Sequence, residues 1–348
     1  LFRMSWWEMV KRNKGKVVAG GAILGGAVAL AVQYRDKGRE GPVMEGGMQA
    51  RRHYIFDANH AACDESIREL APSVARVVHG KVNVESITKQ LQEGTLDVEK
   101  KIELWHELKI GVVTRVLALS HSFALLTIAL KAQISILAAE IVNGANGGTK
   151  NAGWLSWISS SMSSVIGGGT REGGGDSLRN DAARQVFLRS IEYFVQTGVL
   201  QLIAIVEQVT KEHMNDVKLE SVRDSDGLLA LLSQISAKIT EKIDSLSVFV
   251  APLEKDDMST DAVSLLLRRL ISLLDSPLAS KTHDRLVSFY LTAATRNIPE
   301  GALAVQLSSL SSSVSRISST EVDAPLHSSL YSSDVHKFAL HAFNATNN

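Results

Sequence analysis

Four side chains that could bind a metal ion lie close together in the sequence: Asp57, His60, Cys63 and Asp64. Carboxylate, imidazole and thiolate groups are the usual ligands of zinc, and residues three or four apart share one face of a helix. The competing interpretation is a solvated polar face with one buried thiol. We favour it because the sequence has no HExxH motif and no paired CxxC motif.

The other histidines give no clearer indication of catalysis. His121 lies inside a strongly apolar segment and could move a proton, but a histidine in such a place is more often a core residue. His336 and His341 are five residues apart, which puts them on different helix faces. An enzyme would need His60, His121 or Asp57 to converge on one polar pocket. We therefore expect no enzymatic activity, no catalytic residue, no metal and no cofactor.

Composition limits the class of protein further. The 348 residues carry a formal net charge of zero, and 45% of them are hydrophobic. A nucleic-acid-binding protein would need a basic face, and a largely disordered chain would be less hydrophobic. Period-two alternation of apolar residues is scarce, which predicts an all-α fold. The one cysteine, Cys63, leaves no partner for an intrachain disulfide.

The N-terminal region resembles a short membrane anchor. Residues 1–16 are basic, residues 17–34 carry no charge, and basic residues follow. As a helix, 17–34 would span about 27 Å, close to the roughly 30 Å of a bilayer's hydrocarbon core. We favour a single-pass anchor. A secretory signal cleaved near Ala29-Leu30-Ala31 and a glycine-rich buried or interfacial helix are the alternatives.

Two domains follow from this pattern. Residues 1–40 form the basic N-terminus with its anchor, and 41–348 form a helical bundle that begins with a linker. A glycine- and serine-rich loop at 143–176 carries Trp154 and Trp157. A loop of that length is functional or disordered. It is either a variable insertion or a patch that contacts a membrane or a partner.

Apolar residues recur at three- and four-residue spacing in most of the remaining chain, which predicts helices. The predicted helices cover 48–78, 84–91, 100–142, 178–217, 227–249, 258–274, 282–298, 302–317 and 332–343.

The helix predicted at 100–142 is the element around which we expect the other helices to pack. Its first turns are charged, and its middle is apolar on all sides, so other helices must cover it. Trp105 lies in the polar turns, with Lys101, Ile102 and Leu108 one helical turn away. From the residues alone, Trp105 is either bundle-edge packing or a contact residue. Arg115 and Lys131 interrupt the apolar run, and we expect them to pair or to extend to solvent.

Three segments together resemble the peroxin-3 family of peroxisomal membrane protein biogenesis factors. They are QARRHYIFDANHAACDESI at 49–67, KIELWHELKIGVVTR at 101–115 and LLLRRLISLLDSPLASKTHDRLVSFYL at 265–291. The order of features also agrees, from a basic start and a weak anchor to a long apolar helix. The resemblance is specific in the first 140 residues and diffuse beyond them.

This resemblance implies an elongated, twisted helical bundle that is anchored in the peroxisomal membrane and faces the cytosol. It further implies docking of peroxin-19, the receptor that carries newly made membrane proteins, through a short amphipathic helix. By position, the anchoring tryptophan is Trp105, beside Lys101 and Leu108, with Leu91 on the preceding helix. The alternative function is a secreted or lumenal helical protein with a cleaved N-terminal signal.

Overall fold

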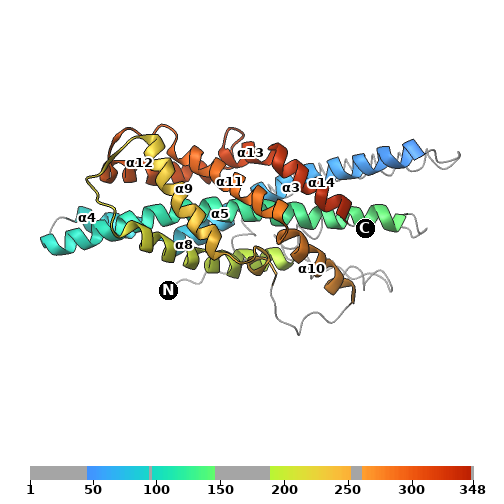
Figure 1. The fold of residues 1–348 in the computed structure, drawn as a ribbon, viewed down its shortest axis with the longest axis horizontal. Coiled ribbons are helices and arrows are strands. Elements are labelled where there is room, and N and C mark those ends of the chain that lie inside the picture. Colours follow the sequence, from blue (N-terminus) through green and yellow to red (C-terminus); the bar gives the residue numbers. More distant parts are fainter. Residues whose placement is uncertain (1–44, 94–95, 146–188, 252–260, 346–348) are drawn as a thin grey trace.

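The computed structural model describes residues 45–93, 96–145, 189–251 and 261–345. They form an elongated all-α bundle (Figure 1). The anchor expected at 17–34, and the loop with Trp154 and Trp157, lie outside the described residues.

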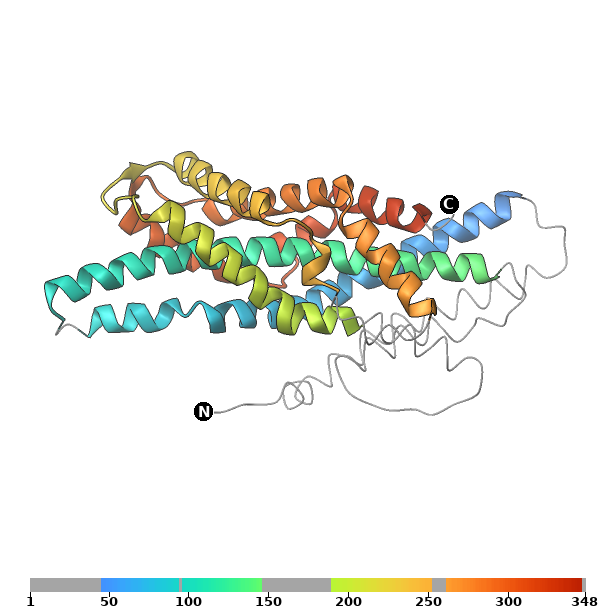
Figure 2. The same ribbon diagram turned by 60° about the horizontal axis from the view of Figure 1, so that its bottom comes forward.

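The bundle is built around the long central helix α5 (Val98–Ala145). Helices α3 (Glu45–Lys81) and α4 (Val84–Gln92) precede it and run in the opposite direction (Figure 2). The helices packed on α5 include α8 (Val199–Met214), α9 (Ser225–Lys242), α10 (Asp261–Leu274), α11 (Pro277–Thr295), α12 (Leu303–Ile317) and α14 (Ser333–Asn344). The apolar middle of α5 is buried throughout, as expected of a helix that is hydrophobic on every side.

Helix ends differ from the expected ones where contacts between distant residues decide them. The helix predicted at 227–249 ends at Lys242, because the Asp275 carboxylate accepts hydrogen bonds from Ser245 and Ser247 and holds this segment as a loop. A 3₁₀ turn, η2 (Ser247–Phe249), follows. Helix α11 starts at Pro277, five residues earlier than expected, with Ser276 as its N-cap.

Three short elements were not anticipated. Strands β1 (Val222–Arg223) and β2 (Gly301–Ala302) pair antiparallel, with Val222 opposite Ala302. Helix α13 (Pro325–Leu330) bridges α11, α12 and α14. Both strands are two residues long, too short for period-two alternation to reveal them.

A π-helical turn, η1 (Phe194–Gly198), leads into α8. A Cβ atom at Gly198 would lie 1.9 Å from the carbonyl oxygen of Phe249, so this site has room only for glycine. We expect Gly198→Ala to destabilise the bundle by about 1–3 kcal/mol, the usual cost of overpacking. Chemical denaturation should measure the loss. Gly80→Ala is the matched control, because a Cβ there meets nothing within 4 Å. Equal stability of the two variants would contradict the expectation.

Candidate functional site

An exposed apolar stripe lies on the first turns of α5, at the end of the bundle that α4 also reaches. Val98 is 69% exposed, Ile102 64% and Trp105 38%. Their spacings of four and three residues put them on one side of the helix. Three large apolar side chains side by side in water are a feature that needs an explanation, whereas single exposed ones are normal.

The other predicted site residues differ from the stripe in how far they are exposed. Lys101 is half-buried, and Leu108 is buried at 8% exposure, beneath the surface. Leu91 of α4 is half-buried and packs against the core. Val98 and Ile102 were not predicted as site residues, although their spacing relative to Trp105 is visible in the sequence.

Helix α4 is held against α5 by a buried arginine. Arg115 of α5 is 2% exposed and pairs with Glu85 through two hydrogen bonds of 2.5 and 2.6 Å. It also donates to the carbonyl oxygen of Val82. The hydrogen bonds from Arg115 lower the pKa of Glu85 to about 2. This confirms the expected pairing of Arg115, and it fixes the helix that carries Leu91.

The segment after α8 is bound to α5 just beyond Trp105. Lys109 is buried, and its Nζ donates to the carbonyl oxygen of Val217 over 2.7 Å. The ring of His106 lies 3.3 Å from the side-chain oxygen of Asn215. Burial lowers the pKa of Lys109. These contacts hold the part of α5 next to the exposed stripe in a fixed position, and a docking site requires such rigid support.

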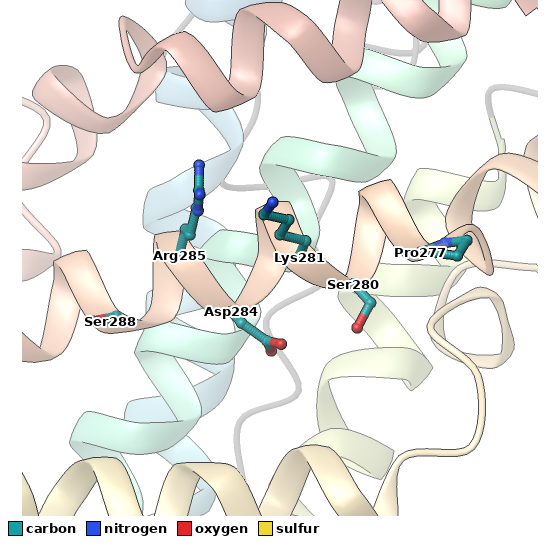
Figure 3. A pocket seen from close by; sticks show the side chains of 6 residues that line it. All are labelled: Pro277, Ser280, Lys281, Asp284, Arg285 and Ser288. Carbon is teal, nitrogen blue, oxygen red and sulfur yellow. The ribbon is translucent and has the colours of Figure 1, made fainter.

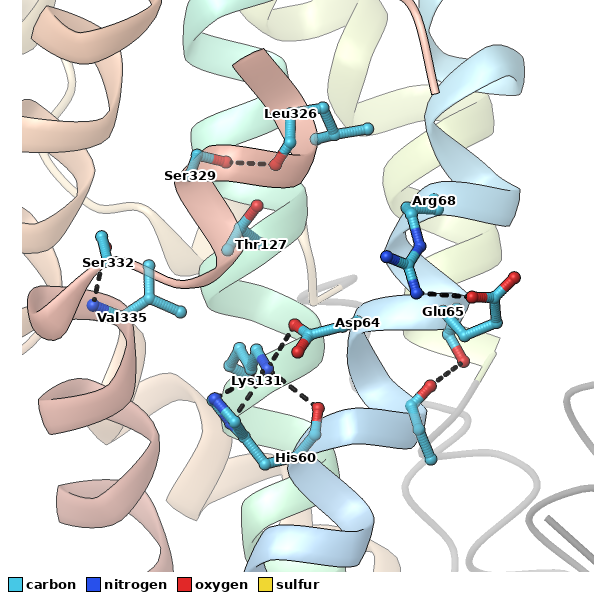
Figure 4. A network of polar contacts seen from close by, with 12 residues as sticks. His60, Asp64, Glu65, Arg68, Thr127, Lys131, Leu326, Ser329, Ser332 and Val335 are labelled. Carbon is cyan, nitrogen blue, oxygen red and sulfur yellow. Dashed lines mark hydrogen bonds and ion pairs between the residues drawn. The ribbon is translucent and has the colours of Figure 1, made fainter. Parts of the chain in front are cut away.

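Two of the residues considered as metal ligands, His60 and Asp64, form a polar cluster with Lys131 of α5 instead (Figure 4). Lys131 Nζ lies 2.6 Å from Asp64 Oδ1 and donates to His60 Nδ1 over 2.9 Å. Asp64 and Cys63 are buried, and Asp57 is exposed. The interpretation as a solvated polar face was therefore wrong for Asp64. Its carboxylate is buried, and the ammonium group of Lys131 from α5 neutralises its charge. Among the described residues, no group of three metal-ligating side chains comes together.

The same cluster predicts how stability depends on pH. A lysine ammonium group can only donate, so the His60 nitrogen that it contacts is unprotonated. Burial and Lys131 lower the pKa of His60 from 6.5 to about 3. Below pH 6.5 His60 is protonated in the unfolded chain, whereas in the folded chain it stays neutral until the pH approaches 3. The stability present above pH 6.5 is therefore lost as the pH falls towards 3.

We expect the melting temperature of the wild-type chain to fall between pH 7 and pH 4 more steeply than that of His60→Gln. Burial raises the pKa of Asp64 and lowers that of His121. Both groups are present in both chains, so the difference between the two profiles isolates His60. Parallel profiles would contradict the assignment.

His121 of α5 has different neighbours from His60, which lies on α3 three residues after Asp57. His121 is fully buried, 3.0 Å from Ser236 Oγ, and its ring lies 5.1 Å from that of His283. It is therefore a core histidine, as expected, but a hydrogen bond satisfies only its Nε2 atom, and its buried Nδ1 has no partner. His60 stacks on Phe56 and meets His336 of α14.

A hollow of about 440 Å³ on α11 is lined mainly by polar residues (Figure 3). Lys281 and Arg285 point to one side of the helix, and Asp284 points to the other. Arg285 pairs with Asp334, and Asp284 lies 3.3 Å from the His283 ring. The charge of Arg285 is thus matched within the chain, and the hollow offers no large apolar side chain to a partner.

One helix in the described part of the chain is apolar and long enough to cross a bilayer. It is the α5 stretch Val98–Glu140, and its most apolar window is completely buried in the bundle. The covering helices give it the environment of a soluble protein's core helix.

Comparison with known proteins agrees with the sequence resemblance. The family model described as Peroxin-3 matches residues 93–267, about half of the chain. Peroxisomal biogenesis factor 3 of Mus musculus is 25% identical over 297 residues, which cover 82% of this chain and 72% of the mouse protein. The Homo sapiens protein of the same name is 27% identical over 221 residues, which cover 62% of this chain and 52% of the human one.

The matched region includes α5 with its exposed stripe and the helices from α8 to the start of α10. Peroxin-3 proteins are biogenesis factors and are not known as enzymes. The chain belongs to the peroxin-3 family, and with it to the proteins that act in peroxisome biogenesis and membrane protein import.

Proposed function

We propose that this chain is a docking receptor for peroxin-19 at the peroxisomal membrane. Residues 17–34 anchor it, and the bundle of residues 41–348 faces the cytosol. Peroxin-19 arrives with a newly made membrane protein and binds through an amphipathic helix. The observation that carries this proposal is the exposed stripe of Val98, Ile102 and Trp105.

The geometry of the stripe suits a helical ligand. A helix that binds in a groove presents apolar residues at three- and four-residue spacing and needs apolar anchors on a rigid surface. Trp105 and Ile102 supply those anchors, and we assign the remaining apolar contact to Leu91, half-buried on α4, and to Leu108, one turn after Trp105. Lys101 lies one turn from Trp105, where its ammonium group can pair with an acidic residue of the ligand.

Binding itself is the first test. Titration of the full chain with the N-terminal peptide of peroxin-19 should give saturable heat with one site per chain. The same peptide with its apolar residues replaced by serine is the control, because it retains the charges and loses the anchors. Absence of binding to the unmodified peptide would refute the docking function. A mature N-terminus near Val32 would refute the anchor and favour the secreted alternative.

A further inference from the structure

A second hollow lies between the end of α8 and the first turns of α9. Its volume is about 400 Å³, within the range of ligand-binding pockets. Val217, Leu231 and Ile235 give it an apolar lining, and Arg223 and Gln234 add polar groups. It therefore combines an apolar surface with one permanent positive charge.

Arg223 has no partner for that charge among the described residues. Its Nε atom is shielded from solvent and makes no hydrogen bond. The two most deeply buried cations of the bundle are matched, Arg115 by Glu85 and Lys131 by Asp64. The nearby Asp224 is engaged elsewhere, since its carboxylate caps α9 by accepting from Gly227 N over 2.7 Å. A shielded donor without an acceptor is costly, and a bound carboxylate would remove that cost.

The hollow is linked to the turn of α5 that follows Trp105 by a hydrogen bond from the buried Lys109. Val217 lines the hollow, and its carbonyl oxygen is the one bound by Lys109. Lys109 lies one helical turn after Trp105 on α5. Gln306 holds the strand from the other side by donating to the carbonyl oxygen of Arg223. Hydrogen bonds therefore fix the backbone at Val217 and at Arg223, the two residues that bound this side of the hollow.

We propose that this hollow is a second contact of the docking surface, one that accepts an acidic side chain and an adjacent aliphatic side chain from the same amphipathic helix. The carboxylate pairs with Arg223, and the aliphatic group packs on Val217 and Leu231. This inference rests on the docking function proposed above. It adds a second acidic residue to the one with which Lys101 can pair.

The test compares Arg223→Gln with Lys218→Gln in the full chain. Lys218 is an exposed cation on the neighbouring segment, so its loss changes the net charge equally. We expect Arg223→Gln to weaken binding of the peroxin-19 N-terminal peptide about ten-fold and Lys218→Gln less than two-fold. Leu231→Ala should weaken it several-fold. Circular dichroism and melting temperature check that each variant folds.

Three results would overturn the inference. If Arg223→Gln binds like the wild type while Trp105→Ala does not, the docking function stands and the hollow plays no part in it. If Lys218→Gln loses as much affinity as Arg223→Gln, the effect is diffuse attraction and not a paired carboxylate. If the wild-type chain does not bind the peptide, the docking function fails, and this inference fails with it.

Discussion

Trp105→Ala should weaken binding of the peroxin-19 N-terminal peptide at least about ten-fold and leave helical content unchanged. The indole is already partly covered, and 38% of the side chain remains exposed. A partner that covers the rest removes roughly 60–100 Å² from water. At about 25 cal/mol per Å², this area contributes roughly 1.5–2.5 kcal/mol to binding, which corresponds to ten-fold or more in affinity.

The control is Phe289→Ala. Phe289 is an aromatic residue of similar exposure, 40%, on α11 outside the stripe. Its loss should leave the affinity unchanged, and both variants should keep the circular dichroism spectrum of the wild type. A Trp105→Ala chain that binds with wild-type affinity in calorimetry would show that the stripe on α5 is not the docking site.

Removal of Lys131 should have the largest effect on stability. Lys131 is 1% exposed and is the ion-pair partner of Asp64. In Lys131→Ala the Asp64 carboxylate would stay buried without a positive partner. Loss of one member of a buried pair commonly costs about 3–5 kcal/mol. Urea denaturation at pH 7 should therefore show a large fall in the unfolding free energy.

Two comparisons separate the ion pair from other effects. Lys238→Ala breaks the exposed pair of Lys238 and Glu241 and should cost less than about 1 kcal/mol. The double variant Lys131→Met with Asp64→Leu replaces both charges by apolar groups and should recover much of the loss. If Lys131→Ala were no less stable than Lys238→Ala, the pair would not contribute to the stability of the bundle.

The two variants with the largest expected effects, Trp105→Ala and Lys131→Ala, change different regions of α5. Lys131 lies about 26 residues after Trp105, which at 1.5 Å per residue is roughly 39 Å along the helix. Folded Lys131→Ala should therefore bind the peptide normally, and Trp105→Ala should unfold normally. A result in which each variant changed both properties would indicate coupling along α5 that the proposed site does not require.

Most of the helical architecture can be read from the residues, because it depends on local patterns. The long stretch without proline and with apolar residues on all sides predicted α5 as a core helix. Recurrence at three and four residues predicted α14 and α12 to within a residue or two at each end. Prediction failed at 227–249 because the end of that helix is decided by Asp275, which lies far along the chain in the turn between α10 and α11.

The sequence by itself determined that this chain is all-α, that its longest helix is a core helix, and that Trp105 shares a helix face with apolar neighbours. The tertiary structure alone decided that Lys131 neutralises Asp64, that Arg115 holds α4, and that Arg223 is left without a partner. The reason is physical: helix periodicity is fixed by residues three and four apart, whereas the pairing and the exposure of a side chain depend on which helices pack against it.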